Sequence, residues 1–199
     1  MNFKILIIAF SVLCFVGCNQ HEQTLIHEYN LGKEEYRKGN LAGSKKHFKR
    51  AVSIKTDYRD VPLYLAKIAY YQGKYEDVGY QLETMLNDET YAYQANLLKL
   101  KNDFVFSKDR VGLSKALENA LAKDSSNLEI LLMAAKVSEE LGKIGHSILL
   151  YERTIQESSK IALAHQNLFR IYNQAGIKER AKYHSKKFEL WNEKHEYQK

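Results

Sequence analysis

The sequence predicts an all-α chain: an α-solenoid of about five helical hairpins that follows an N-terminal export signal. Three observations predict the solenoid. The glycines at positions 39, 73, 142 and 176 follow one another at spacings of 34, 69 and 34 residues. These spacings indicate a repeat of about 34 residues, because 69 is two such repeats and one extra residue. Apolar residues recur at helical spacing between these glycines. The chain of 199 residues includes one proline, the residue that helix interiors tolerate least.

The N-terminal segment 1–17 has the pattern of an export signal. Lys4 is followed by a stretch, 5–16, that is apolar except for Ser11. This length suits a signal core and is short of the roughly 20 residues that span a bilayer. Phe15-Val16-Gly17-Cys18 resembles the bacterial lipobox, in which the cysteine receives a diacylglyceryl group, although Phe15 stands where Leu is usual.

The lipobox resemblance implies that residues 1–17 are removed, that lipid is attached at Cys18, and that residues 18–24 form a short tether. An ordinary cleaved signal is the first alternative, but Phe15 does not fit a cut after Gly17. A buried N-terminal helix is the second, but this segment lacks a polar face. Asn19 follows the cysteine where an aspartate would retain an enteric lipoprotein in the inner membrane, so we expect the periplasmic face of the outer membrane.

Charge and cysteine content narrow the classes of partner. Without Lys4 the mature chain has 29 Lys and Arg against 24 Asp and Glu, a net charge of +5. Export makes nucleic acid an improbable partner, so acidic proteins and anionic headgroups are the better candidates. Cys14 leaves with the signal, so Cys18 is the only cysteine of the mature chain and no intramolecular disulfide can form.

One segment identifies the type of repeat. Residues 29–58 read YNLGKEEYRKGNLAGSKKHFKRAVSIKTDY and resemble a tetratricopeptide repeat, with Leu31-Gly32 on the first helix, Gly39 at the turn, and Phe48 and Ala51 on the second helix. We place the one residue by which the spacing from Gly73 to Gly142 exceeds two repeats in the loop 87–93. The solenoid then covers 25–195, and a tail follows at 196–199. The five repeats are then 25–58, 59–92, 94–127, 128–161 and 162–195. A plain helical bundle is the alternative.

The third repeat is the weakest match, because Lys108 replaces the turn glycine and Lys101 occupies a position that is normally small and buried. In this register one apolar stripe follows each helix. The expected core positions are Leu31, Phe48, Ala51, Leu65, Ala66, Ala69, Val78, Leu82, Met85, Leu97, Leu100, Phe104, Leu113, Leu117, Ala120, Leu131, Ala134, Ala135, Tyr151, Leu168, Phe169, Tyr172, Ala181 and Phe188. Trp191 and His195 are expected to cap the last repeat, and a binding role is the alternative for Trp191.

The sequence shows no constellation for catalysis, cofactor binding or metal binding. Its histidines include no pair at the spacing of one helical turn, and no nucleophile or phosphate-loop motif is present. Glu34-Glu35 and Glu139-Glu140 are best interpreted as solvated helix faces. We therefore expect no enzyme, no cofactor and no small-molecule substrate.

Resemblance to the repeat family implies that first helices line a concave groove. One column of groove positions is basic, which would suit carboxylates of a protein segment. It consists of Lys33, Lys67, Asn102, Lys136 and Arg170. Chance is the alternative, since lysine and arginine are common at exposed helix positions.

A second group of groove positions is aromatic and lies in the first three repeats, beside Arg37. Aromatic residues next to cations are enriched in binding hot spots, but they also pack between helices. The group consists of Tyr29, Tyr36, Tyr70, Tyr71 and Phe106. Glu139 and Glu140 would make the groove acidic further along. The lysine and asparagine pattern of the carboxylate-clamp subset is not reproduced, since Tyr29 and Lys33 occupy those places.

The second helix of repeat 1 carries Lys45, Lys46, Lys49 and Arg50 a short distance along the chain from Cys18. This patch would suit anionic headgroups, and a solvated helix face is the alternative. Together these features predict a lipid-anchored adaptor that binds a protein segment in its groove. An obligate or self-associating subunit of a membrane complex is the alternative.

Overall fold

The computed structural model describes the backbone of residues 3–196 and the side chains of residues 20–191. Over this range every regular element is a helix, and there is no strand. The helices are α1 (Phe3–Arg37), α2 (Leu41–Ile54), α3 (Val61–Tyr71), α4 (Tyr75–Leu82), α5 (Ala92–Phe106), α6 (Arg110–Lys123), α7 (Leu128–Glu140), α8 (Ile144–Gln174) and α9 (Lys178–Glu196). The predicted all-α solenoid is thereby confirmed.

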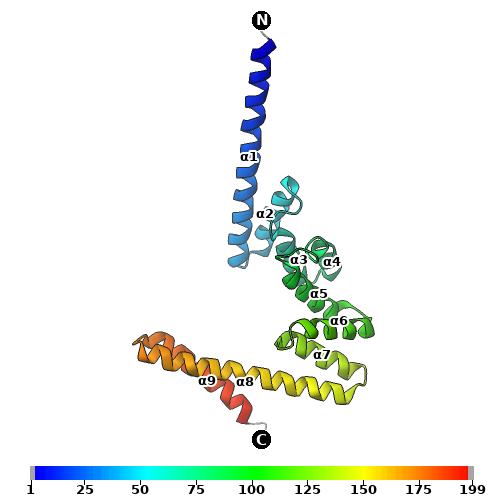
Figure 1. Ribbon diagram of the computed structural model, residues 1–199, viewed down its shortest axis with the longest axis vertical. Coiled ribbons are helices and arrows are strands. Elements are labelled where there is room, and N and C mark those ends of the chain that lie inside the picture. The colour runs from blue at the N-terminus through cyan, green and yellow to red at the C-terminus, as the bar shows by residue number, and fades with distance from the viewer. Residues whose placement is uncertain (1–2, 197–199) are drawn as a thin grey trace. The chain divides into compact units, whose positions relative to one another are not determined.

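The chain divides into two compact halves, Met1–Phe106 with α1 to α5 and Ser107–Lys199 with α6 to α9. In the N-terminal half α1 packs on α2, α3 on α4, and α5 on α3 and α4 (Figure 1). In the C-terminal half α7 packs on α6 and α8, and α9 packs on α8.

The four turn glycines end helices in the same way. Gly39, Gly73, Gly142 and Gly176 have φ between 71° and 78°, a left-handed conformation that costs glycine nothing. After each glycine the next backbone N–H bonds a carbonyl five positions earlier, as from Lys74 to Ala69 at 2.9 Å. This is the Schellman motif, which satisfies carbonyls that the helix end leaves open.

The third turn is built differently, because it has no glycine. Ser107 to Asp109 connect α5 to α6, and Lys108 is not left-handed. Asp109 caps α6 instead, since its Oδ1 accepts a hydrogen bond from the Gly112 N–H at 2.8 Å. The boundary between the two halves falls at this link, so α5 and α6 of the predicted third repeat belong to different halves.

Repeats 1 and 2 share a core that follows the predicted stripes. Phe48 and Ala51 are fully buried, and Gly32 leaves room for Phe48, since a Cβ on Gly32 would lie 2.7 Å from the ring. Ser44 Oγ donates to the Gly32 carbonyl at 2.9 Å. An equivalent bond recurs three repeats later between Ser147 and Ala135 at 3.0 Å, which shows that repeats 1 and 4 keep one register.

Helix α8 differs from the predicted repeat pattern. The boundary expected at 161/162 lies inside it, because α8 continues from Ile144 to Gln174 without a break. The segment 157–161, Glu-Ser-Ser-Lys-Ile, contains no proline, glycine, asparagine or aspartate to end a helix. Ser158 and Ser159 direct their hydroxyls to carbonyls three positions earlier, at 2.8 and 2.7 Å, and so stay within the helix.

The described part of the predicted signal and tether, residues 3–24, belongs to α1, which is continuous to Arg37. The side chain of Cys18 lies outside the described residues, as does that of His195. Over the described part of the chain, no helix is both long and apolar enough to cross a bilayer. At the other end Phe188 and Trp191 are half-buried on α9.

Candidate protein-binding surface

Tyr29 is a core residue that contacts the candidate surface in the N-terminal half. This tyrosine is 5% exposed, and its ring contacts Phe48 and Tyr58 with centroids 6.4 and 5.4 Å apart. Its hydroxyl donates to Asp60 Oδ1 at 2.8 Å. Burial, with the neighbouring Asp60 carboxylate, raises the pKa of Tyr29 to about 12. Tyr29 was predicted in the groove, but the structure places it in the core.

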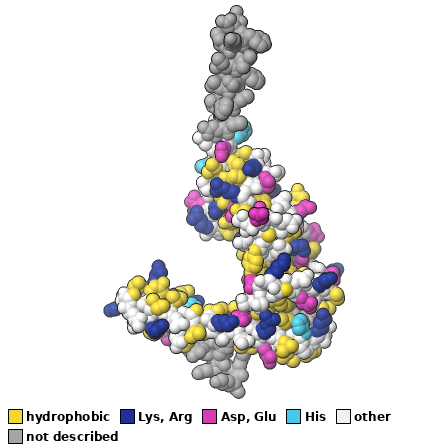
Figure 2. All heavy atoms as spheres, viewed as in Figure 1, with side chains coloured by type: hydrophobic (Ala, Val, Ile, Leu, Met, Phe, Trp, Pro, Cys, Tyr) yellow, Lys and Arg dark blue, Asp and Glu magenta, His cyan; other side chains and the backbone are white. Residues whose placement is uncertain are grey.

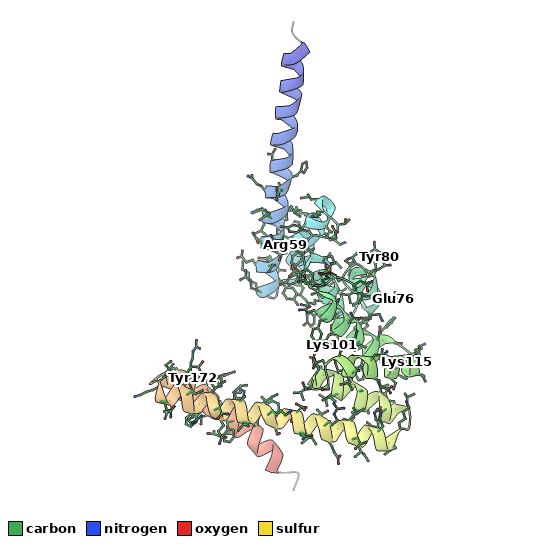
Figure 3. The ribbon with its side chains drawn as sticks, viewed as in Figure 1. Arg59, Glu76, Tyr80, Lys101, Lys115 and Tyr172 are labelled. Carbon is green, nitrogen blue, oxygen red and sulfur yellow. The ribbon has the colours of Figure 1, made fainter. Side chains whose placement is uncertain are left out.

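Arg59, labelled in Figure 3, lies near both rings of this tyrosine pair. Its guanidinium carbon lies 5.2 Å from the Tyr29 ring centre and 5.1 Å from that of Tyr58. Among the described residues, Arg59 is the one non-glycine with a positive φ, 50°. Such a conformation costs an L-residue about 1–2 kcal/mol, which the two ring contacts offset in part. The sequence carries no signal for this role.

Two of the predicted groove lysines approach the same ring. Lys33 Nζ lies 5.9 Å from the Tyr64 ring centre and Lys67 Nζ lies 5.5 Å from it. Lys33 also donates to the Tyr29 hydroxyl at 3.3 Å. Burial raises the pKa of Tyr64, although the charge of Lys33 opposes this shift. The repeat spacing predicted the two lysines, but it did not indicate that both would lie near the Tyr64 ring.

Lys67 is half-buried, and burial lowers its pKa from the ordinary value of 10.5. Asp60 opposes this shift, and the positive charge of Lys101 adds to it. Within the described side chains Lys67 forms no ion pair within 4.0 Å. Its ammonium is therefore partly dehydrated and contacts a π face, an arrangement that favours the arrival of an anion.

The residue that continues this column is Lys101, labelled in Figure 3. Asn102, the predicted member, is 5% exposed, and its side-chain oxygen is buried without a hydrogen-bond partner. Lys101 is half-buried and close enough to Lys67 to lower its pKa. Lys101 follows Lys67 at the spacing that separates Lys67 from Lys33, so the extra residue of the repeat pattern lies after α5 rather than in the loop 87–93.

A row of aromatic side chains borders the lysines. Tyr36 lies edge-on to Tyr64 at 4.9 Å, and burial, with the neighbouring Tyr71, raises the pKa of Tyr36 to about 12. The row continues through ring contacts of 5.8 to 5.9 Å between Tyr70, Tyr71, Tyr75 and Phe106. Tyr71 and Phe106 are 64% and 50% exposed, so the end of the row is open to solvent.

Arg37 is exposed beside the row, and its Nε donates to the Lys33 carbonyl at 3.4 Å. We name this set of half-buried and exposed side chains the basic-aromatic surface. It consists of Lys33, Tyr36, Arg37, Tyr64, Lys67, Tyr71 and Lys101.

The remaining members of the predicted column lie in the C-terminal half. Lys136 pairs with Glu139 at 3.2 Å, and this hydrogen bond raises the pKa of Lys136. Glu139 also accepts a hydrogen bond from the Tyr151 hydroxyl at 3.1 Å. Glu140 pairs with Arg110 at 3.0 Å, and Arg170 is exposed. Lys33 and Lys67 therefore lie together in the N-terminal half, and Lys136 and Arg170 belong to the C-terminal half.

The basic patch on α2 is partly committed to an internal network. Glu28 is 9% exposed and accepts from His47 at 2.7 Å and from Arg50 at 3.3 Å. Burial alone would raise the pKa of Glu28, but these two partners lower it. Lys46 and Lys49 are exposed. Arg50 is thus tied to α1, while the two lysines remain at the surface.

The fold also brings together two histidines that are distant in the sequence. His165 on α8 and His184 on α9 place their Nδ1 atoms 2.8 Å apart, and Tyr172 stacks on His184 at 5.4 Å. Burial, with the charges of His184 and Lys187, lowers the pKa of His165. No group of three His, Cys, Asp or Glu side chains in the described part of the chain could hold a metal ion.

These features define the protein as a tetratricopeptide-like α-solenoid. It has a basic and aromatic surface on α1, α3 and α5, the first helices of its first three repeats. No family model matches the chain, and no curated protein matches its sequence. The chain does resemble solved structures, at sequence identities of 21% or less, and this similarity is one of fold.

The solved structures that resemble it include several of the protein MamA. A crystal structure of MamA superimposes with a TM-score of 0.61 and 20% identity, over 87% of this chain and 94% of that one. Another MamA crystal structure gives 0.58 and 21%, over 82% and 95%. MamA from Desulfovibrio magneticus RS-1, from residue 41 to its end, gives 0.62 and 12%, over 86% and 96%.

Proposed function

We propose that this chain is a non-catalytic adaptor that holds an acidic segment of a partner protein on the basic-aromatic surface. The observation that carries the proposal is Lys67, a partly dehydrated cation without a carboxylate partner at the centre of the surface. An unpaired, half-buried cation destabilises a fold, so retaining it favours a role in binding.

The neighbouring residues supply what a binding site needs. Lys33 and Lys101 extend the positive charge on either side of Lys67. Tyr71 and Phe106 add exposed rings, which contribute large contact area at a low cost in side-chain entropy. A segment with two carboxylates and an aromatic or aliphatic residue would complement both features.

We further propose that Cys18 carries a lipid and holds the adaptor at the periplasmic face of a bacterial membrane. The apolar segment 5–16, Gly17 and Cys18 support this anchor, and Asn19 favours the outer membrane. An adaptor held at the envelope would act in assembly of an envelope complex, where a tethered scaffold raises the effective concentration of its partner.

A site-specific photocrosslinker tests the proposed surface. Placed at Tyr71, 64% exposed, it should trap the partner in cells, whereas the same group at Tyr80, 77% exposed on α4, should not. The double variant Lys33→Glu/Lys67→Glu should lose the Tyr71 product. The matched charge change Lys46→Glu/Lys49→Glu on the exposed face of α2 should keep it. Equal products from Tyr71 and Tyr80, or insensitivity to both charge changes, would contradict the proposal.

A further inference from the structure

Repeats 1 and 2 show how neighbouring hairpins stack in this protein. Phe48 on α2 and Ile68 on α3 are both 0% exposed and belong to one cluster, with Val52 half-buried against it. The Phe48 ring stacks on Tyr64 at 4.9 Å. The second helix of one repeat thus covers, and is covered by, the first helix of the next.

Repeats 4 and 5 carry the same two faces at equivalent positions, but each face is partly exposed to solvent. On repeat 4, Tyr151 and Ile155 correspond to Phe48 and Val52. On repeat 5, the corresponding positions to Val61, Leu65 and Ile68 are Ala164, Leu168 and Ile171. Ile155 is 44% exposed and Ile171 is 50% exposed, whereas Ile68 is 0% exposed.

Continuous α8 keeps these faces apart. In repeats 1 and 2 a non-helical link from Lys55 to Asp60 lets α3 fold back on α2. In repeats 4 and 5 the positions of Ile155 and Ile171 instead lie on one unbroken helix. They are therefore about 24 Å apart along the helix axis and about 160° apart around it. Figure 1 shows α7 and α9 against different parts of α8.

We infer that a second copy of this chain supplies the missing contact. The terminal hairpin of one copy, residues 162–174 of α8 with α9, stacks on the open face of repeat 4 in another copy. The face of repeat 4 with Ile155 and the face of repeat 5 with Ile171 are complementary, because the equivalent faces of repeats 1 and 2 pack against each other. Every copy of the chain carries both faces. Exchange of an identical element between chains is a low-cost route to oligomers.

The exposed side chains on α8 fit this occupant. Ile144, Ile148 and Ile155 are 56%, 52% and 44% exposed and follow one side of the helix. Leu41, which corresponds to Ile144, is half-buried against the core of repeats 1 and 2. Hydrophobic side chains also reach the surface over this half in Figure 2. This association is independent of the basic-aromatic surface, which lies in the other half.

The molar mass of the full chain in detergent provides the first test. The unmodified chain should form dimers or longer chains as its concentration rises, and Ile171→Asp should be monomeric. Ile155→Asp should act in the same way from the other face. Val111→Asp, at a residue 70% exposed on α6, is the matched control and should associate like the unmodified chain. A monomeric unmodified chain, or equal behaviour of all three variants, would overturn the inference.

Crosslinking between chains identifies the occupant. Tyr151 and Asn167 correspond to the stacked pair Phe48 and Tyr64. In a Cys14→Ser/Cys18→Ser background, chains with Tyr151→Cys are mixed with differently tagged chains with Asn167→Cys and treated with a short bis-maleimide. The expected product joins the two tags. A chain that carries both Tyr151→Cys and Asn167→Cys is treated in the same way. If this chain is crosslinked at monomer mass and the mixture gives no product, the chain closes on itself and the inference fails.

Discussion

Lys67 places its ammonium 5.5 Å from the centre of the Tyr64 ring, in a position where burial lowers its pKa and no carboxylate of the described residues pairs with it. The relationship links stability to binding. Since the folded pKa lies below the value in the unfolded chain, the charged form of Lys67 is disfavoured by folding at neutral pH. The charged Lys67 therefore lowers the stability of the isolated protein, and an anion that binds beside it would remove this destabilisation.

Replacing this lysine should separate the two effects. Lys67→Met keeps the length of the side chain and removes its charge, so we expect Tm to rise by about 2 °C while binding of an acidic partner is lost. Lys38→Met is the control, because Lys38 is paired at the surface with Glu34 at 2.7 Å and its loss should change Tm little. Thermal unfolding at pH 7 measures both. A fall in Tm for Lys67→Met alone would contradict the argument.

Two glycines in the second repeat separate backbone strain from packing. A Cβ at either Gly73 or Gly79 would meet no atom within 4 Å, but only Gly73 has a left-handed φ, 71°. Gly73→Ala should therefore lower the free energy of unfolding by about 1 kcal/mol. Gly79→Ala, inside α4, should raise it by about 0.5–1 kcal/mol. Urea denaturation gives both values, and shifts of the same sign would refute this account of the turn.

The histidine pair should make the terminal hairpin sensitive to acid. The pKa of His165 is lowered from 6.5, so its stabilising contribution is present above pH 6.5 and is lost as pH falls toward the folded pKa. Lys187, Tyr172 and Tyr183 surround the pair, and no carboxylate among the described side chains accepts a hydrogen bond from either imidazole.

Hydrogen exchange measures this effect directly. Between pH 7.5 and 5.5, after correction for intrinsic rates, α9 amides should lose protection while α2 amides should not. His165→Gln, which does not titrate, should remove the difference. Unchanged protection of α9 in the unmodified protein would show that protonation of this pair does not open the hairpin.

The anchor can be tested independently of the partner. Cys18→Ser should abolish incorporation of an alkyne-tagged fatty acid and reduce the membrane-bound fraction. Cys14→Ser, in the segment expected to be removed, should leave both unchanged and serves as the control. Continued labelling of Cys18→Ser would show that lipid is attached elsewhere or not through this motif.

The turns and most of the core could be predicted from sequence because they depend on local chemistry. A left-handed helix end needs glycine, so Gly39, Gly73, Gly142 and Gly176 marked four hairpins in advance. Phe48, Leu82, Leu117 and Leu131 are 0% exposed, as their register predicts. Phe169, also expected in the core, is 37% exposed, because repeat 5 does not stack on repeat 4.

The candidate site was predictable only in part. The repeat spacing found Lys33 and Lys67, but an extra residue assigned to the wrong side of α5 pointed to Asn102 instead of Lys101. Tyr29 and Tyr36 shared a periodicity that suits either a groove or a core. The pattern alone does not distinguish these roles, because both place an aromatic ring on the inner side of a first helix.

By itself, the sequence determined that this protein is helical, that its hairpins recur at a nearly constant length, and where four of them turn, since these follow from residue spacing and backbone conformation. The tertiary structure decided which lysines share the Tyr64 ring, and that the faces of repeats 4 and 5 stay open. Those outcomes depend on burial by segments that are distant in the chain, and on the unbroken course of α8 from repeat 4 into repeat 5. No local pattern records either.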